Sequence, residues 1–147
     1  MSQENIDLVR EYAEQYGQVA PKDTPQFAAR FWDPDGDYYP VRKFPEARPC
    51  HGLDEIARFQ AEYIDAWGGY EFALTKLIAV ADDRVFVQTI VHAEGRESGV
   101  RLDDDLYHCA WLRQGRIFRW EDHLTVKGAL RALGLSGENL EAAGLRE

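Results

Sequence analysis

Two side chains near one predicted turn could together transfer a proton. Asp122 lies near the end of the segment Gly115–Leu124, which reads GRIFRWEDHL, and His108 lies in the strand-like segment before it. A buried carboxylate beside an imidazole changes the proton affinity of both groups and can poise one of them as a general acid or base. That chemistry requires both side chains to point to the same face of the sheet.

The turn between the two segments decides whether they do. The loop between Leu112 and Arg116 has glycine as its third residue, which favours a type I turn closed by a left-handed residue. In that register Leu112 pairs with Arg116, and His108 pairs with Trp120. His108 and Asp122 are then diagonal neighbours, roughly 7–8 Å apart at the backbone. A two-residue loop would put a different side chain beside Asp122, so the prediction depends on this turn.

Alternation along the two strands gives the hairpin two different faces. The inner face is predicted to carry Leu106, His108, Ala110, Phe118, Trp120 and Asp122. The outer face is predicted to carry Tyr107, Cys109, Trp111, Ile117, Arg119, Glu121 and His123. Because the apolar half of the outer face is too large to leave in contact with water, we expect a homodimer that pairs through this face.

Four segments have the residue spacing of helices that could cover such a sheet. Apolar residues recurring at three- and four-residue steps predict helices over residues 5–16, 53–67 and 126–133. A short helix is predicted to begin at Thr24-Pro25, as an N-cap followed by proline, and to end near residue 31. The tail after Gly134 is expected to add at most one further helical turn.

The strand-like segments predict one curved sheet. They cover residues 37–41, 70–81, 84–96, 102–112 and 116–124, and a turn cluster is predicted at 33–36. This order of elements predicts an α+β domain over residues 1–147, with a core from about 5 to 135. We expect a cone-shaped roll in which three to four helices lie on the concave side of a strongly curved antiparallel or mixed sheet.

Composition excludes several classes of function. The chain has 147 residues and is 45% hydrophobic, which suits one domain with a substantial core. A net charge of −9 leaves no basic face for nucleic acid, and no apolar run approaches the roughly 20 residues needed to cross a bilayer. The polar, acidic start does not resemble a signal peptide. Cys50 and Cys109 are interpreted as free thiols, which predicts a cytoplasmic protein.

Three stretches resemble the nuclear-transport-factor-two-like fold, and within it the SnoaL-like group. They are Cys50–Ile56, the hairpin Ser98–Ile117, and Trp120-Glu121-Asp122 followed by Ala129–Leu135. The resemblance extends over about residues 5 to 135. It implies a cone-shaped pocket and, commonly, a dimer formed through the sheet. The family includes isomerases, cyclases, dehydratases, epoxide hydrolases and proteins with no known activity, so the fold alone implies no one reaction.

The resemblance also implies roles for single residues. Asp122 is similar in position to the catalytic acid/base of the SnoaL-type polyketide cyclases. It also matches one acid of the Asp-Arg-Asp set of limonene epoxide hydrolases, in the same Trp-x-Asp context. His108 matches a pocket histidine of the cyclases, and Tyr12 lies where ketosteroid isomerases keep a tyrosine on the first helix.

Other positions depart from the family patterns. The base of the ketosteroid isomerases would fall near Tyr39, which is not an acid. The arginine and the other acid of the epoxide hydrolases align with Ile90 and His92, so that set is broken here. The residues expected to line the pocket beside Asp122 and His108 are Tyr12, Tyr39, Tyr63, Ile90, His92, Phe118 and Trp120.

Two functions stay open from the sequence. The first is an isomerase, cyclase, dehydratase or hydrolase that acts on a small apolar oxygenated substrate, with Asp122 moving a proton and His108 orienting it or supporting charge on oxygen. The second is a non-catalytic module of the same shape that binds a small apolar ligand or assembles as a dimer. Neither function needs an organic cofactor. No histidine pair has the spacing of a metal site, so no metal is expected.

Overall fold

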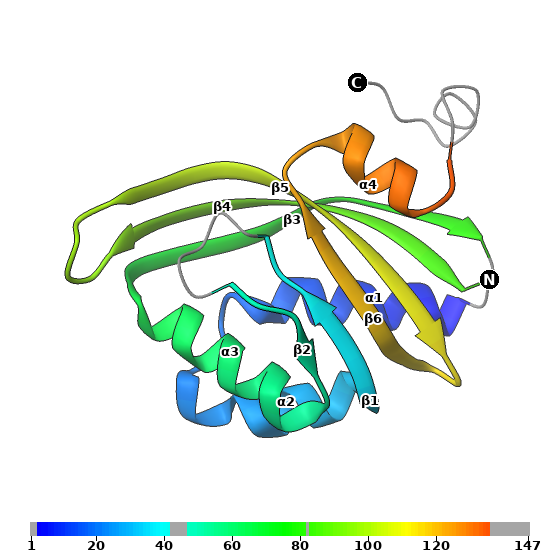
Figure 1. Cartoon of the computed structure of the whole chain (residues 1–147), viewed down its shortest axis with the longest axis horizontal. Coiled ribbons are helices and arrows are strands. Elements are labelled where there is room, and N and C mark those ends of the chain that lie inside the picture. Colours follow the sequence, from blue (N-terminus) through cyan, green and yellow to red (C-terminus); the bar gives the residue numbers. More distant parts are fainter. Residues whose placement is uncertain (1–2, 42–46, 82, 136–147) are drawn as a thin grey trace.

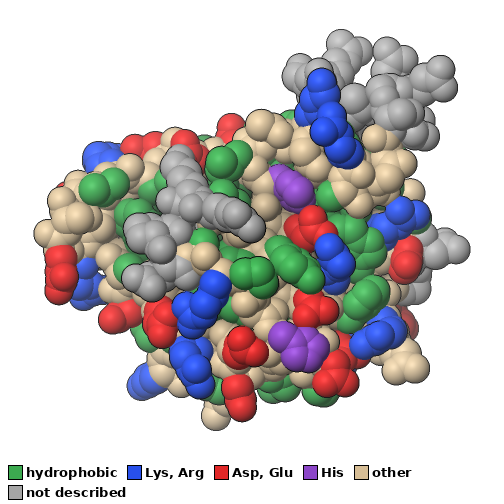
Figure 2. Space-filling view, viewed as in Figure 1, with side chains coloured by type: hydrophobic (Ala, Val, Ile, Leu, Met, Phe, Trp, Pro, Cys, Tyr) green, Lys and Arg blue, Asp and Glu red, His purple; other side chains and the backbone are tan. Residues whose placement is uncertain are grey.

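The computed structural model describes residues 3–41, 47–81 and 83–135, without the side chains of residues 68–70. The helical turn expected in the tail after Gly134 lies outside these residues. None of the described helices is both long and apolar enough to cross a membrane. Figure 2 shows acidic, basic and hydrophobic side chains interspersed over one face of the molecule.

The described part of the chain contains four α-helices close to the predicted positions, although the helix predicted over residues 53–67 ends at Asp65 and Trp67 begins a strand. They are α1 (Gln3–Tyr16), α2 (Thr24–Phe31), α3 (Leu53–Asp65) and α4 (Val126–Ala132), and a 3-10 turn (Pro21–Asp23) leads into α2. Thr24 is the first residue of α2 rather than its cap. Its hydroxyl contacts the carbonyl oxygens of Pro21 and Ala57, and the second contact ties α2 to α3.

Within residues 3–41, 47–81 and 83–135, six strands form one mixed sheet in the order β2-β1-β6-β5-β4-β3. Their bounds are β1 (Trp32–Tyr39), β2 (Cys50–His51), β3 (Trp67–Ala81), β4 (Arg84–Gly95), β5 (Arg101–Arg113) and β6 (Arg116–His123). Only β1 and β6 pair in parallel; the other neighbours are antiparallel. The predicted α+β architecture is confirmed.

The turn cluster predicted at residues 33–36 lies inside β1 instead. The pairing of β1 with β6 shifts register between Trp32 and Asp37, so the turn-forming residues make an irregularity within the strand. The carboxylate of Asp33 accepts a bond from the backbone N–H of Asp35, which is the local bond that acidic residues make in turns. These residues do form a turn-like hydrogen bond, as predicted, but the chain does not reverse its direction there.

The helices cover both faces of the curved sheet (Figure 1). Helices α1, α2 and α3 pack on the concave face and enclose the largest hydrophobic cluster, which agrees with the lower end of the predicted three to four helices. Helix α4 packs on the opposite face. There Ala129, Leu130 and Leu133 meet Phe86 and Cys109.

Helix α4 therefore covers part of the apolar outer face that led to the prediction of a dimer. Tyr107 and Trp111, two of the residues assigned to that face, pack against the α4 cluster. Nearby, the Arg119 guanidinium lies 4.7 Å above the ring of Tyr39 and 5.3 Å from the ring of Trp111. Pairing of two copies through the remainder of this face stays a prediction.

The two cysteines are free and buried, and both are expected to resist thiol reagents. Burial raises the pKa of the Cys50 thiol to about 11 and raises that of Cys109 still further. Cys109 also donates its thiol proton to the Ala129 carbonyl oxygen at 3.1 Å, beneath α4. Because the thiolate is the reactive form, neither thiol should react with Ellman-type disulfide reagent at pH 8 within minutes. Both should react in denaturant; rapid reaction of Cys109 in the folded protein would contradict the placement of α4.

The hairpin between β5 and β6 is built differently from the prediction. Arg113 pairs with Arg116, so the loop has two residues, and Gln114 and Gly115 both have positive φ, 53° and 75°. This is the geometry of the tight hairpin turns that favour glycine. The predicted three-residue loop is wrong.

A β-bulge restores the orientation that the shorter loop would have reversed. Leu112 pairs with Ile117 and Trp111 pairs with Arg119, which leaves Phe118 as an extra residue on β6. Ile117 consequently lies in the core with no exposed surface, not on the outer face as predicted. Beyond the bulge, the inward orientation predicted for Trp120 is confirmed.

Candidate functional site

A pocket lies between the sheet and helices α1 and α3. The space within and in front of it is about 470 Å³, a figure that includes open solvent at its mouth. It is lined by Tyr12, Ala13, Tyr16, Tyr38, Phe59, Tyr63, Phe72, Val91, Leu106, His108, Trp120 and Asp122. Among the described residues that line it, Asp122 is the one with a carboxylate.

The Asp122 carboxylate is held in the pocket wall by three donors. His108 directly faces it across the β5–β6 pair, and His108 Nδ1 lies 2.6 Å from Asp122 Oδ1. The indole N–H of Trp120 donates to the same oxygen at 2.9 Å, and the hydroxyl of Tyr38 donates to Oδ2 at 2.5 Å. Both oxygens act as acceptors, and the side chain is only 5% exposed.

Both ring nitrogens of His108 are bonded within the protein. Nδ1 faces Asp122, and Nε2 lies 2.8 Å from the hydroxyl oxygen of Thr89 on β4. A hydroxyl, an imidazole and a carboxylate in this order resemble a nucleophilic triad. Thr89 has no exposed surface and does not line the pocket, so a ligand there cannot reach its hydroxyl.

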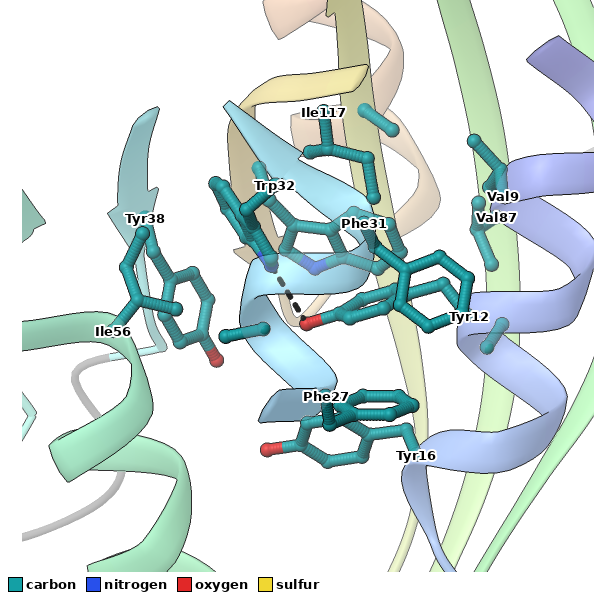
Figure 3. Packing of buried hydrophobic residues seen from close by; sticks show 14 of the residues in the cluster. Val9, Tyr12, Tyr16, Phe27, Phe31, Trp32, Tyr38, Ile56, Val87 and Ile117 are labelled. Carbon is teal, nitrogen blue, oxygen red and sulfur yellow. Dashed lines mark hydrogen bonds between the residues drawn. The ribbon is translucent and has the colours of Figure 1, made fainter. Parts of the chain in front are cut away.

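Two tyrosine hydroxyls lie in the pocket wall as phenols. Burial raises the pKa of Tyr38 well above its usual value, and the nearby Asp122 carboxylate raises it further. Burial is also the main cause that raises the pKa of Tyr12. The oxygen of Tyr12 accepts the indole N–H of Trp32 at 3.2 Å, drawn as the dashed line in Figure 3, and the amide N–H of Gln60 at 2.6 Å.

Aromatic rings surround these polar groups. Adjacent ring centroids lie 5.1–6.2 Å apart along the closed series Tyr12, Tyr16, Phe72, His108 and Trp120. These rings come from α1, β3, β5 and β6, so the wall depends on contacts between distant parts of the chain. An apolar wall with few polar groups suits a small, largely apolar ligand.

The structure brings together five of the residues predicted for the site. Asp122, His108, Trp120, Tyr12 and Tyr63 all line the pocket. His108 and Asp122 are opposite each other rather than diagonal, because the two-residue loop and the bulge each move the register by one position from the predicted pairing.

Two predicted pocket residues lie on the other face of β4. Val87, Thr89 and Val91 are buried toward the helices, so strand alternation turns Ile90 and His92 away from the pocket. The His92 side chain is 46% exposed and lies 2.8 Å from Asp103, an acid on the neighbouring strand. Their assignment to the pocket is wrong.

Tyr39 and Phe118 are also outside the pocket. Tyr39 follows the inward-facing Tyr38 on β1 and therefore lies on the outer face, where Arg119 covers its ring. Phe118 is the bulged residue, and the guanidinium of Arg113 lies 4.8 Å above its ring. Both assignments are corrected by the local geometry of the strand.

Tyr38 is the main site residue that the sequence analysis missed. A signal for it exists: Asp35, Asp37 and Tyr39 alternate along the strand, and two acids on one face indicate the solvent side. Tyr38 then points inward. The other lining residues that are not among those expected from the sequence are Ala13, Tyr16, Phe59, Phe72, Val91 and Leu106.

Solved structures share the fold. One is a hypothetical protein from Catenulispora acidiphila DSM 44928 that has a ketosteroid isomerase-like fold and was solved in complex with trimethylamine. Its sequence is 15% identical and its TM-score is 0.68, and the alignment covers 90% of this chain and 95% of that chain. A second is an NTF2-like protein of unknown function from Burkholderia pseudomallei K96243, with 22% sequence identity and a TM-score of 0.68. That alignment covers 89% of this chain and 97% of the other chain. A third is TerC, co-crystallised with polyporic acid, with 20% sequence identity and a TM-score of 0.67. That alignment covers 90% of this chain and 100% of TerC.

These identities, all below 25%, show the fold alone. No curated protein matches the chain. The family model of the SnoaL-like domain matches residues 9–120, which include the second half of α1, all of α2 and α3, and most of the sheet. The resemblance seen in the sequence is thereby confirmed, and the chain belongs to the SnoaL-like domain family.

Proposed function

We propose that the protein binds a small, largely apolar, oxygenated molecule in this pocket and moves a proton on it through Asp122, with no organic cofactor. One observation carries the proposal: a carboxylate that is 5% exposed lies in the wall of an aromatic pocket, fixed by three hydrogen-bond donors. A carboxylate removed from water and held in one orientation is well placed for general acid–base catalysis.

Asp122 is the group that meets the ligand. Its Oδ1 accepts two bonds, whereas Oδ2 accepts the single bond from Tyr38 and keeps acceptor capacity for a proton of the ligand. His108 has both nitrogens engaged, so its role is to orient the carboxylate through Nδ1 and not to contact ligand oxygen. This differs from the oxygen-stabilising role considered for His108 from the sequence.

Tyr12 is the group that can support charge on a ligand oxygen. Its oxygen already accepts bonds from Trp32 and Gln60, so its phenol proton can be donated to the ligand. Those two bonds also polarise the phenol and make it a stronger donor. A base and a donor on one pocket wall fit removal of a proton beside a carbonyl, the first step of enolisation, isomerisation and aldol-type cyclisation.

The related structures support a small-molecule ligand. TerC was crystallised with polyporic acid and the Catenulispora protein with trimethylamine, so this fold holds small organic molecules in at least two cases. Since the two molecules differ greatly in chemistry, they support small-molecule binding and not a particular substrate.

The base can be tested without knowing the natural substrate. In the ring-opening of 5-nitrobenzisoxazole, a base removes the ring C–H proton as the N–O bond breaks, which leaves a nitrile and a coloured phenolate. The protein should accelerate this reaction, and Asp122→Asn should lower the rate by about 100-fold or more, because the amide cannot accept the proton. Glu121→Gln is the matched control, since Glu121 is the adjacent acid on the outer face of β6. Equal rates for the wild type and Asp122→Asn would overturn the proposal.

A non-catalytic binding module is the second candidate. The observation in its favour is that the donors around Asp122 and both nitrogens of His108 are satisfied within the protein. A module of this kind would give no elimination activity but would retain an apolar ligand through purification. Native mass spectrometry of the freshly purified protein, followed by identification of any released ligand, separates the two candidates.

A further inference from the structure

We propose that Thr89 is a positioning residue that lets His108 change its charge inside the pocket wall without losing a hydrogen bond. In doing so it sets how readily the histidine beside Asp122 takes up a second proton. The inference rests on the proposed function, in which Asp122 acts as the base, but it can be tested separately.

The geometry places the Thr89 hydroxyl on the histidine nitrogen that Asp122 does not reach. Thr89 on β4 pairs with Leu106 on β5, which makes it a diagonal neighbour of His108 on the same face of the sheet. Its oxygen lies 2.8 Å from Nε2. Thr89 has no exposed surface and His108 is 3% exposed, so water does not replace this contact.

A hydroxyl suits both charge states of the ring. In neutral His108, Nδ1–H donates to Asp122 and Nε2 accepts the proton of the Thr89 hydroxyl. In the imidazolium, Nε2–H donates, and the same hydroxyl rotates to accept. A hydroxyl can do either because it carries one donor and two acceptor lone pairs, whereas a fixed carbonyl or amide N–H would favour one state.

The charge of His108 matters because it changes the basicity of Asp122. A carboxylate next to an imidazolium holds a proton less strongly than one next to a neutral imidazole. The titratable groups lining the pocket with His108 are Asp122, Tyr12, Tyr16, Tyr38 and Tyr63. From β3 and β4 the ring meets Phe72 and Thr89, which carry no charge. Asp122 is therefore the acid to which a change at Thr89 is transmitted.

Two variants at position 89 separate the hydroxyl from the shape of the side chain. Thr89→Ser keeps the hydroxyl, and Thr89→Val keeps the shape but can neither donate nor accept. In Thr89→Val both charge states of His108 lose this bond, but a hydrogen bond to a charged group is worth more than one to a neutral group. The imidazolium should therefore be disfavoured by about tenfold relative to the neutral ring. The rise of 5-nitrobenzisoxazole elimination with pH should then move about one unit lower in pH. Thr89→Ser should keep the wild-type profile.

A second readout does not depend on catalysis. ¹⁵N NMR of the His108 ring should show a neutral form protonated at Nδ1, and the transition to the imidazolium should lie about one pH unit lower in Thr89→Val than in Thr89→Ser. If elimination is absent but this difference is seen, the proposed function is wrong and the role of Thr89 stands. If Thr89→Val matches the wild type in both measurements, the role of Thr89 is overturned. Thermal unfolding checks the fold of each variant, and Thr89→Ala takes the place of Thr89→Val if the valine variant does not fold.

Discussion

Asp122→Leu is expected to lower the free energy of unfolding by about 3–5 kcal/mol, although it replaces a charged group in the pocket wall by an apolar one of similar size. Three donors converge on the carboxylate: the Tyr38 hydroxyl, the Trp120 indole N–H and His108 Nδ1–H. A leucine leaves all three without an acceptor, and each buried donor that loses its partner costs about 1–3 kcal/mol. Urea denaturation followed by far-UV circular dichroism measures the change.

The same substitution at an exposed acid is the control. Asp103 also lies in the sheet and also contacts a histidine, His92, but its side chain is 44% exposed. Water replaces the lost acceptor there, so Asp103→Leu should change the free energy of unfolding by no more than about 0.5 kcal/mol. Asp122→Asn should fall between the two, since its amide oxygen still accepts. If both leucine variants were equally stable, the three donors around Asp122 would not be bonded as described.

The inward orientation of Asp122 is predictable from strand alternation in the sequence, but the length of the β5–β6 loop is not. Alternation along β5 and β6 placed Asp122 and His108 on one face, and the structure agrees. The predicted three-residue loop was wrong, and the bulge at Phe118 compensates for the shorter turn. A bulge inserts one residue without a strong sequence signal, so Ile117 and Phe118 were assigned to the wrong faces while the residues beyond them were assigned correctly.

The partners of Asp122 and His108 outside the hairpin were not predictable from local patterns. Tyr38 reaches Asp122 because β1 pairs in parallel with β6, which joins residues 84 positions apart in the chain. Thr89 reaches His108 through the register between β4 and β5. Periodicity shows which face a side chain occupies, but the order of strands and their register decide which side chains meet across that face.

The position of α4 illustrates the same limit. An amphipathic helix was predicted correctly over residues 126–133, and its apolar residues had to be buried somewhere. The sequence does not show on which side of the sheet it packs. Since it packs on the outer face, it covers part of the apolar surface that the sequence analysis attributed to a second copy of the chain.

Trp32→Ala is expected to be the most destabilising substitution in the core, with a loss of about 3–5 kcal/mol. Trp32 has no exposed surface, and its ring centroid lies 6.4 Å from that of Tyr12 and 6.3 Å from that of Tyr38. Figure 3 shows these three side chains within the same cluster. The Trp32 ring also packs over Gly36, where an added Cβ would lie only 2.6 Å from Trp32 Cε3. An alanine would leave a large cavity between β1 and α1 that these neighbours cannot fill without breaking their own contacts.

The loss of Trp32 should also change the pocket wall, because Tyr12 loses the hydrogen bond that its hydroxyl oxygen accepts from the Trp32 indole N–H. Trp32→Phe separates the two effects: it keeps most of the packing and removes only the donor, so it should be closer to wild type in urea denaturation. Phe118→Ala is the control for removing a large ring near the same strand pair. Since Phe118 is the half-buried bulged residue, its loss should cost under about 1.5 kcal/mol. A Trp32→Ala variant no less stable than Phe118→Ala would mean that the cluster around Tyr12 is not the main core.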